Sequence, residues 1–164
     1  MRGAGSGFTL MEMLIAVAIV GVLAMLAVPS FQSNIVRDQI VQAVPLTSIA
    51  KKPIELLWSA TQSLPADNAA AGLPPPAKIV NNYIRAVTVQ DGAIHITFGN
   101  NAHTTIKDRI LTLRPAVVDD TPVVPVAWVC GFAQAPGGMT VKGPNRTDIP
   151  EGLLPFNCKH TPGG

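Results

Sequence analysis

The chain has 164 residues and a formal net charge of +2, and it is 48% hydrophobic but only 13% charged. The nearly balanced charge and the 5% aromatic content argue against a nucleic-acid-binding protein, which normally carries a basic face or aromatic rings for stacking bases. The apolar content excludes an intrinsically disordered chain, and the length fits one domain of ordinary size.

The apolar residues are concentrated near the N-terminus. From Phe8 to Val28 every residue except Thr9, Glu12 and Gly21 is apolar, and none is proline. A helix of this length rises about 30 Å, which matches the hydrocarbon core of a bilayer. Because the segment is apolar on all sides, a buried core helix is the weaker interpretation. We predict a membrane-spanning helix over 8–29, with the short N-terminal flank in the cytoplasm and the following domain outside.

A cleaved secretory signal peptide is the alternative interpretation of this segment. Such a signal ends in a cleavage site with two small residues, and Ala27-Val28-Pro29 fits that pattern poorly. The small residues lie instead before the apolar run, from Gly3 to Gly7. This placement predicts processing ahead of the helix, with the helix itself retained.

The residues Gly7-Phe8-Thr9-Leu10-Met11-Glu12, followed by the unbroken apolar run, resemble the N-terminal motif of type IV prepilins. The resemblance implies that a prepilin peptidase removes the leader 1–7 by cutting between Gly7 and Phe8, and that the same enzyme methylates the new amino group of Phe8. It also implies a single-pass precursor in the inner membrane, with its N-terminus in the cytoplasm. The pilus assembly machinery would then polymerise the chain, as a homo-oligomer, into a helical filament on the cell surface.

Glu12 would be the fifth residue of the processed chain, which is the acidic position that the family requires. A carboxylate near the end of a membrane helix costs roughly 2–3 kcal/mol, so a partner is expected. The resemblance implies that the partner is the Phe8 amino group of the same or a neighbouring subunit, which makes Phe8 and Glu12 the residues of subunit assembly. The alternative is that Glu12 lies at the membrane interface and reaches water.

Residues 30–64 are expected to continue as an amphipathic helix that is half embedded in the head domain. Apolar residues recur there at near-helical spacing. Pro29 is predicted to kink the long helix, or else to mark the start of a new one. Pro45 and Pro53 fall within the amphipathic part, and because an interior proline costs about 3 kcal/mol, we expect a kink or a break there.

The residues 65–164 are predicted to form a β-rich globular head. Its first part, 65–77, contains three consecutive prolines, which indicates a loop. The strongest strand signal is a hairpin over 83–98, in which Asp91-Gly92 form the turn. With that turn, the apolar residues of both strands fall on one face, as expected if this face covers a core.

Two further strands are predicted at 110–113, where Pro115 follows, and at 126–130. An antiparallel sheet of about four strands packed on one long helix is an α+β fold. The type IV pilin fold has this architecture, with the C-terminal half of the helix on the sheet and a disulfide-closed loop at the C-terminus.

Cys130 and Cys158 lie 28 positions apart in a domain expected outside the cytoplasm, where oxidation is favoured. The segments 128–131, 139–141 and 154–159 resemble the end of a major pilin, where a disulfide commonly closes a surface loop. The resemblance therefore implies a Cys130–Cys158 bridge, which would stabilise the fold by about 3.5 kcal/mol in the chain-entropy model. A metal pair or a catalytic thiol is the alternative, and the spacing supports neither.

We predict no enzyme, no catalytic residue, no cofactor and no metal site. The three histidines show no metal-ligand spacing, and the sequence contains no phosphate-binding loop, nucleophile elbow or carboxylate cluster. The expected function is a structural subunit of a type IV pilus, most like a major pilin, which serves adhesion, twitching motility or DNA uptake; its surface receptor is unknown. A minor pilin or a type II secretion pseudopilin is the alternative, and a signal-anchored extracytoplasmic binding domain is a third hypothesis.

Overall fold

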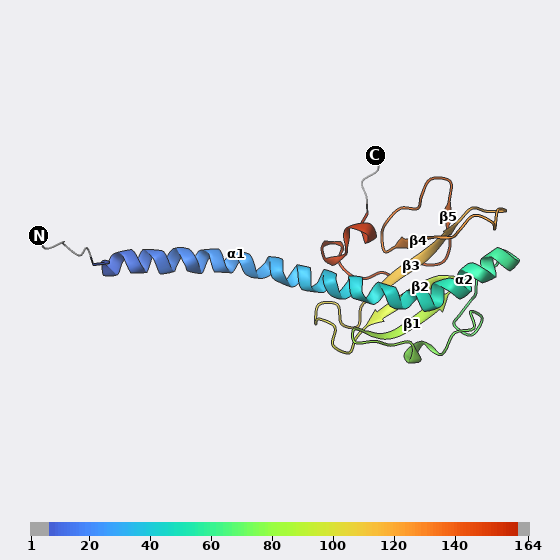
Figure 1. The fold of residues 1–164 in the computed structure, drawn as a ribbon, viewed down its shortest axis with the longest axis horizontal. Coiled ribbons are helices and arrows are strands. Elements are labelled where there is room, and N and C mark those ends of the chain that lie inside the picture. Colours follow the sequence, from blue (N-terminus) through green and yellow to red (C-terminus); the bar gives the residue numbers. More distant parts are fainter. Residues whose placement is uncertain (1–6, 161–164) are drawn as a thin grey trace, which may run out of the picture. The chain divides into compact units, whose positions relative to one another are not determined.

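The computed structural model describes residues 7–160, except for the side chains of residues 27–32 (Figure 1). It divides into two compact units between Ile35 and Val36, and each is described by itself. The predicted leader 1–7 therefore lies outside the described residues, apart from Gly7. Helix α1 extends over Leu10–Ala43, and in the first unit its side chains are exposed on every side as far as Leu26. Among the residues described, no helix is both long enough and apolar enough to cross a membrane.

The two prolines of the amphipathic part have different structural effects. Pro45 lies in a short 3-10 turn, η1 (Val44–Thr47), which interrupts the regular helix after α1. Proline is tolerated at the start of a helical turn because the N–H that it lacks has no partner there. Pro53 lies inside the next helix, α2 (Ser48–Thr61), which continues through it. The chain thus breaks the helix at Pro45 and accommodates Pro53 within α2.

The sheet confirms the predicted hairpin and its register. Strands β1 (Ile84–Gln90) and β2 (Ala93–Phe98) pair antiparallel, with Val89 opposite Ile94 and Val87 opposite Ile96. Asp91 and Gly92 both have positive φ, 49° and 78°, as the favoured two-residue hairpin turn requires.

Strand β3 (Ile110–Val117) is longer than predicted and includes Pro115. Pro115 lies between the part of β3 that pairs with β2 and the part that pairs with a short strand β5 (Thr140–Val141). A strand can contain proline at such a break in the ladder, because no neighbouring carbonyl needs its N–H. The described strands are ordered β1-β2-β3-β4, with β4 spanning Ala127–Cys130 and β5 added on β3.

The core of the second unit lies between its helical residues and one face of the sheet (Figure 1). Helix α2 contributes a stripe at helical spacing, formed by Ala50, Ile54 and Trp58. The strand residues of the core cluster are Ile84, Val87, Val89, Ile94, Ile96, Phe98, Leu111, Leu113 and Cys130.

Candidate functional site

Helix α1 begins with a capping box formed by two residues of the N-terminal motif. The Glu12 N–H donates to Thr9 Oγ1 at 3.3 Å, and the Thr9 N–H donates to the Glu12 carboxylate at 3.4 Å. The Thr9 hydroxyl donates to the same carboxylate oxygen, also at 3.4 Å. A Thr-x-x-Glu pattern of this kind satisfies amide groups that a helix leaves unpaired in its first turn.

The capping box places the Glu12 carboxylate close to Phe8, the predicted first residue of the processed chain. Its oxygen contacts the amide of Thr9, which follows Phe8 directly. Gly7 is exposed and Phe8 is 76% exposed, so the bond between them is open to an enzyme. The role of Thr9 was missed in the sequence analysis, although the Thr-x-x-Glu spacing is its signal. The predicted assembly residues both lie at the start of α1, with Phe8 just before the helix and Glu12 in its first turn.

Pro29 falls within the bounds of α1, but its side chain lies outside the described part of the chain. The kink at Pro29 therefore stays a prediction.

The predicted disulfide is present. The sulfur atoms of Cys130 and Cys158 are 2.04 Å apart, and their Cα atoms are 4.5 Å apart. Cys130 ends β4, and Cys158 ends a short 3-10 turn, η4 (Phe156–Cys158). The Phe132 N–H also donates to the Cys158 carbonyl at 3.0 Å. The bridge and this hydrogen bond together hold the C-terminal segment against the β4 edge.

The loop closed by the disulfide also contacts strand β3. The Lys142 N–H donates to the Pro115 carbonyl at 2.8 Å, and the Arg146 N–H donates to Thr112 Oγ1 at 3.0 Å. Beneath this segment His95 is buried, with Nδ1 2.9 Å from Thr112 Oγ1. Burial, together with the nearby Arg146 charge, lowers the pKa of His95 to about 4. His95 is therefore neutral at pH 7 and belongs to the packing under the loop.

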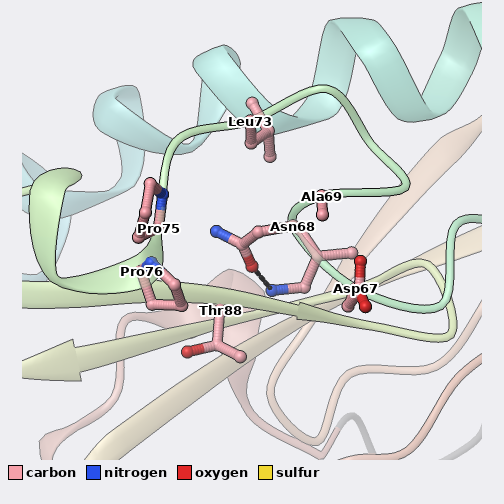
Figure 2. Close-up of a pocket in the computed structure, with 8 residues that line it drawn as sticks. Asp67, Asn68, Ala69, Leu73, Pro75, Pro76 and Thr88 are labelled. Atoms are coloured by element: carbon pink, nitrogen blue, oxygen red, sulfur yellow. Dashed lines mark hydrogen bonds between the residues drawn. The ribbon is translucent and has the colours of Figure 1, made fainter.

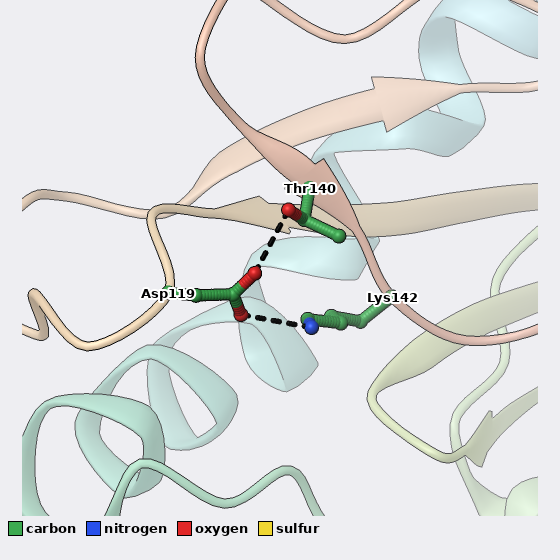
Figure 3. A network of polar contacts seen from close by, with 3 residues as sticks. All are labelled: Asp119, Thr140 and Lys142. Carbon is green, nitrogen blue, oxygen red and sulfur yellow. Dashed lines mark hydrogen bonds and ion pairs between the residues drawn. The ribbon is translucent and has the colours of Figure 1, made fainter.

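Strand β5 is held in place by a polar network with the connection that follows β3 (Figure 3). Asp119 accepts a hydrogen bond from the Thr140 hydroxyl at 2.9 Å and forms an ion pair with Lys142 at 2.8 Å. The hydrogen bonds from Lys142 and Thr140 lower the pKa of Asp119. No sequence pattern predicted β5, because a two-residue strand has no periodicity of its own.

The opposite edge of the sheet, β1, is covered by the loop after α2 (Figure 2). The buried Asn68 side chain donates from Nδ2 to the Val87 carbonyl at 3.0 Å and accepts from the Val89 N–H at 2.7 Å. It also donates to the Pro74 carbonyl at 3.1 Å. Asn68 therefore pairs with β1 as a neighbouring strand would, which protects the edge from other chains.

A cavity of about 420 Å³ opens beside Asn68, between the loop and β1 (Figure 2). The residues that line it are Asp67, Asn68, Ala69, Leu73, Pro75, Pro76, Thr88 and Val89. The cavity was missed in the sequence analysis, because a loop and a strand distant in sequence form it together. Among the described residues, no group of three or more His, Cys, Asp or Glu side chains could hold a metal ion.

Comparisons with known proteins match both ends of the chain. The family model described as pilin, a bacterial filament protein, matches residues 36–159, and the prokaryotic N-terminal methylation motif matches residues 4–28.

Three similar proteins show how much of the chain is shared. The type IV major pilin protein PilE1 of Neisseria gonorrhoeae is 29% identical over 158 residues, covering 93% of this chain and 86% of that protein. A fimbrial protein of Neisseria meningitidis serogroup A is 32% identical over 126 residues, covering 76% and 72%. The type IV major fimbrial protein FimA of Dichelobacter nodosus is 28% identical over 178 aligned positions, covering 97% and 99%.

Proposed function

The chain belongs to the pilin family and is a structural subunit of a pilus, and from this premise we propose how it is processed and assembled. The chain is made as a single-pass precursor in the inner membrane, with its N-terminus in the cytoplasm. A prepilin peptidase cuts it between Gly7 and Phe8 and methylates the new amino group. The pilus assembly machinery then polymerises it into a helical filament of identical subunits.

The observation that supports this proposal best is the start of α1. The proposed cleavage site is exposed and lies ahead of Leu10, the first residue of the helix. Cutting after Gly7 would therefore leave the capping box of Thr9 and Glu12 intact, because both residues follow the cut. The helix does not have to refold when the leader is lost.

The same geometry supports the proposed pairing of Glu12. The cut gives Phe8 a positively charged amino group one residue before the amide that the Glu12 carboxylate already contacts. An ionised carboxylate surrounded by apolar side chains is costly when it has no partner. We infer that Glu12 pairs with the Phe8 amino group of its own or a neighbouring subunit, and that this pairing aligns the subunits along the filament.

The exposed apolar side chains of α1 support the proposal that this helix lies first in the membrane and then in the filament. Every described large apolar side chain from Phe8 to Leu26 is more than half exposed, and an apolar surface of this extent requires a cover. We propose that lipid covers it in the precursor and that other subunits cover it in the filament. Burial contributes about 25 cal/mol for each Å² of apolar surface, so a segment of this length contributes many kcal/mol per subunit.

The intact mass of the subunit from sheared filaments tests the processing. We expect the mass of the chain without residues 1–7, increased by one methyl group, and fragmentation should place that group on Phe8. A chain that still begins at Met1 would overturn this proposal.

The variant Glu12→Ala tests the pairing. We expect it to be cut normally but to form no filaments, because the Phe8 amino group then has no partner carboxylate. Thr9→Ala is the matched control, since it removes the hydroxyl of the capping box and leaves the carboxylate, and it should still assemble. Normal filaments from Glu12→Ala would contradict the proposed role of Glu12.

A further inference from the structure

One large apolar side chain of the head is exposed to solvent on a turn that the disulfide holds in place. Phe156 is 86% exposed and begins the turn η4, which ends at Cys158 of the disulfide. The Cys158 N–H donates to the Pro155 carbonyl at 3.0 Å, and the Lys159 N–H donates to the Phe156 carbonyl at 3.3 Å. A single exposed apolar residue is common on protein surfaces, so the meaning of Phe156 depends on whether a matching surface exists.

The cavity beside Asn68, whose lining residues are drawn in Figure 2, is large enough to receive an aromatic ring such as that of Phe156. Its apolar walls come from Leu73, Pro75, Pro76 and Val89, and its volume is about 420 Å³, well above that of one phenyl ring and within the range of pockets that bind small molecules. The three hydrogen bonds of Asn68 fix the loop that forms the wall. The cavity is therefore a preformed apolar site, which requires little ordering when an aromatic ring enters it.

The protrusion and the cavity lie at opposite edges of one sheet. Phe156 is attached to β4 through the disulfide, and the cavity is built on β1, while the strand order is β1-β2-β3-β4. Figure 1 shows the loop before β1 and the C-terminal turns on opposite sides of the sheet. Two different surfaces of this kind form a heterologous contact, and a heterologous contact that does not close into a ring generates an open helical filament.

Charges near the two surfaces also differ in sign. Asp67 lines the cavity, and Lys159 follows Phe156 by three residues. Among the described residues, neither side chain takes part in an ion pair, since the ion pairs there join Arg85 to Asp108 and Lys142 to Asp119. Opposite charges at the rim of a contact favour one orientation of the partner over others.

We propose that Phe156 of one subunit inserts into the cavity between Leu73 and Val89 of a neighbouring subunit, with Lys159 near the partner's Asp67. This contact between heads rests on the proposed function, because it requires that the chain assembles into filaments. Each subunit then uses one protrusion and one cavity. A head within the filament contacts one neighbour through Phe156 and another neighbour through its cavity.

Photo-crosslinking in assembled filaments tests the contact. The photoreactive analogue p-benzoylphenylalanine replaces Phe156 in the full chain, expressed in a host that keeps its pilus assembly machinery but lacks its own major pilin. Irradiation of sheared filaments should give covalent dimers and higher multimers, and mass spectrometry should place the crosslink within residues 67–76 or 88–89 of a second copy. Assembled filaments with crosslinks elsewhere, or with none, would overturn the contact.

Three single variants and one double variant measure how much this contact contributes to filament assembly. Phe156→Ala removes the protrusion and Ala69→Phe fills the cavity, and each should lower the recovered filament mass about tenfold, the loss typical of a buried aromatic anchor. The double variant should be no worse than either single variant, because both remove the same contact. Val123→Ala is the matched control, since Val123 is 84% exposed and lies outside both surfaces.

The outcomes separate the two proposals. If the unsubstituted chain forms no filament in this host, the proposed function and the contact are both overturned. If filaments form and Phe156→Ala behaves like Val123→Ala, the contact alone is overturned. The thermal unfolding midpoint of Phe156→Ala should equal that of the unsubstituted chain, because the exposed side chain contributes little to the fold, so a loss of filaments with an unchanged midpoint supports the contact.

Discussion

The substitution Asn68→Ala tests whether one side chain holds the loop on the β1 edge. The change removes two hydrogen bonds to β1, from Nδ2 to the Val87 carbonyl and from the Val89 N–H to Oδ1, and a third to the Pro74 carbonyl. A buried polar group left without a partner costs about 1–3 kcal/mol. Counting only the two groups left unpaired on β1, we expect a loss of about 2–6 kcal/mol in the free energy of unfolding.

Urea unfolding of the full chain in mild detergent, followed by tryptophan fluorescence, measures this loss. Asn68→Asp should destabilise the fold at least as much at pH 7, because its carboxylate places oxygen opposite the Val87 and Pro74 carbonyls. Asn82→Ala is the control, since the exposed Asn82 side chain bonds to the exposed Asn101 side chain and its loss should cost less than about 0.5 kcal/mol. A loss below about 1 kcal/mol for Asn68→Ala would refute the reasoning.

Three further predictions concern the C-terminal loop. Replacing both Cys130 and Cys158 by serine should lower the free energy of unfolding by about 3.5 kcal/mol, measured in urea, because the bridge closes a long loop; no change would contradict this. Gly131→Ala should cost more than about 2 kcal/mol, because Gly131 has φ +56° and a Cβ there would lie 2.7 Å from the Cys158 carbonyl, whereas Gly137→Ala enters open space and should be neutral. The pKa of His95 is lowered from 6.5 to about 4 in the folded state, so the unfolded chain binds more protons between these values. Its contribution to stability is therefore complete above pH 6.5 and is lost as the pH falls toward 4; His95→Gln should flatten that part of the stability profile.

The elements predicted well from the sequence are those with a strong local signal. The hairpin around Asp91-Gly92 combines a turn that needs positive φ with alternating apolar residues, and these two constraints agree on one register. The N-terminal motif likewise lies within a few consecutive residues. The disulfide was inferred from the family resemblance rather than from geometry, and the structure confirms it.

The features that the sequence analysis missed depend on contacts between distant segments. Strand β5 forms because Thr140 and Lys142 meet Asp119, and no local pattern marks that meeting. Asn68 is an isolated asparagine in a loop, and only its position beside β1 makes it a substitute for a strand. Strand β3 was predicted to stop before Pro115 because proline lacks an N–H, but the change of partner from β2 to β5 removes the need for one.

The protection of the sheet edges bears on how such subunits associate. An exposed edge strand offers unpaired N–H and carbonyl groups, and copies at the high local concentration of a filament would pair through them irreversibly. In this chain the Asn68 side chain and its loop cover β1, and β4 at the other edge is only four residues long. With backbone pairing suppressed at both edges, association must depend on side chains. Side-chain contacts such as the apolar surface of α1 and the Phe156 protrusion can form and separate without unfolding the head, as a filament that assembles from folded subunits requires.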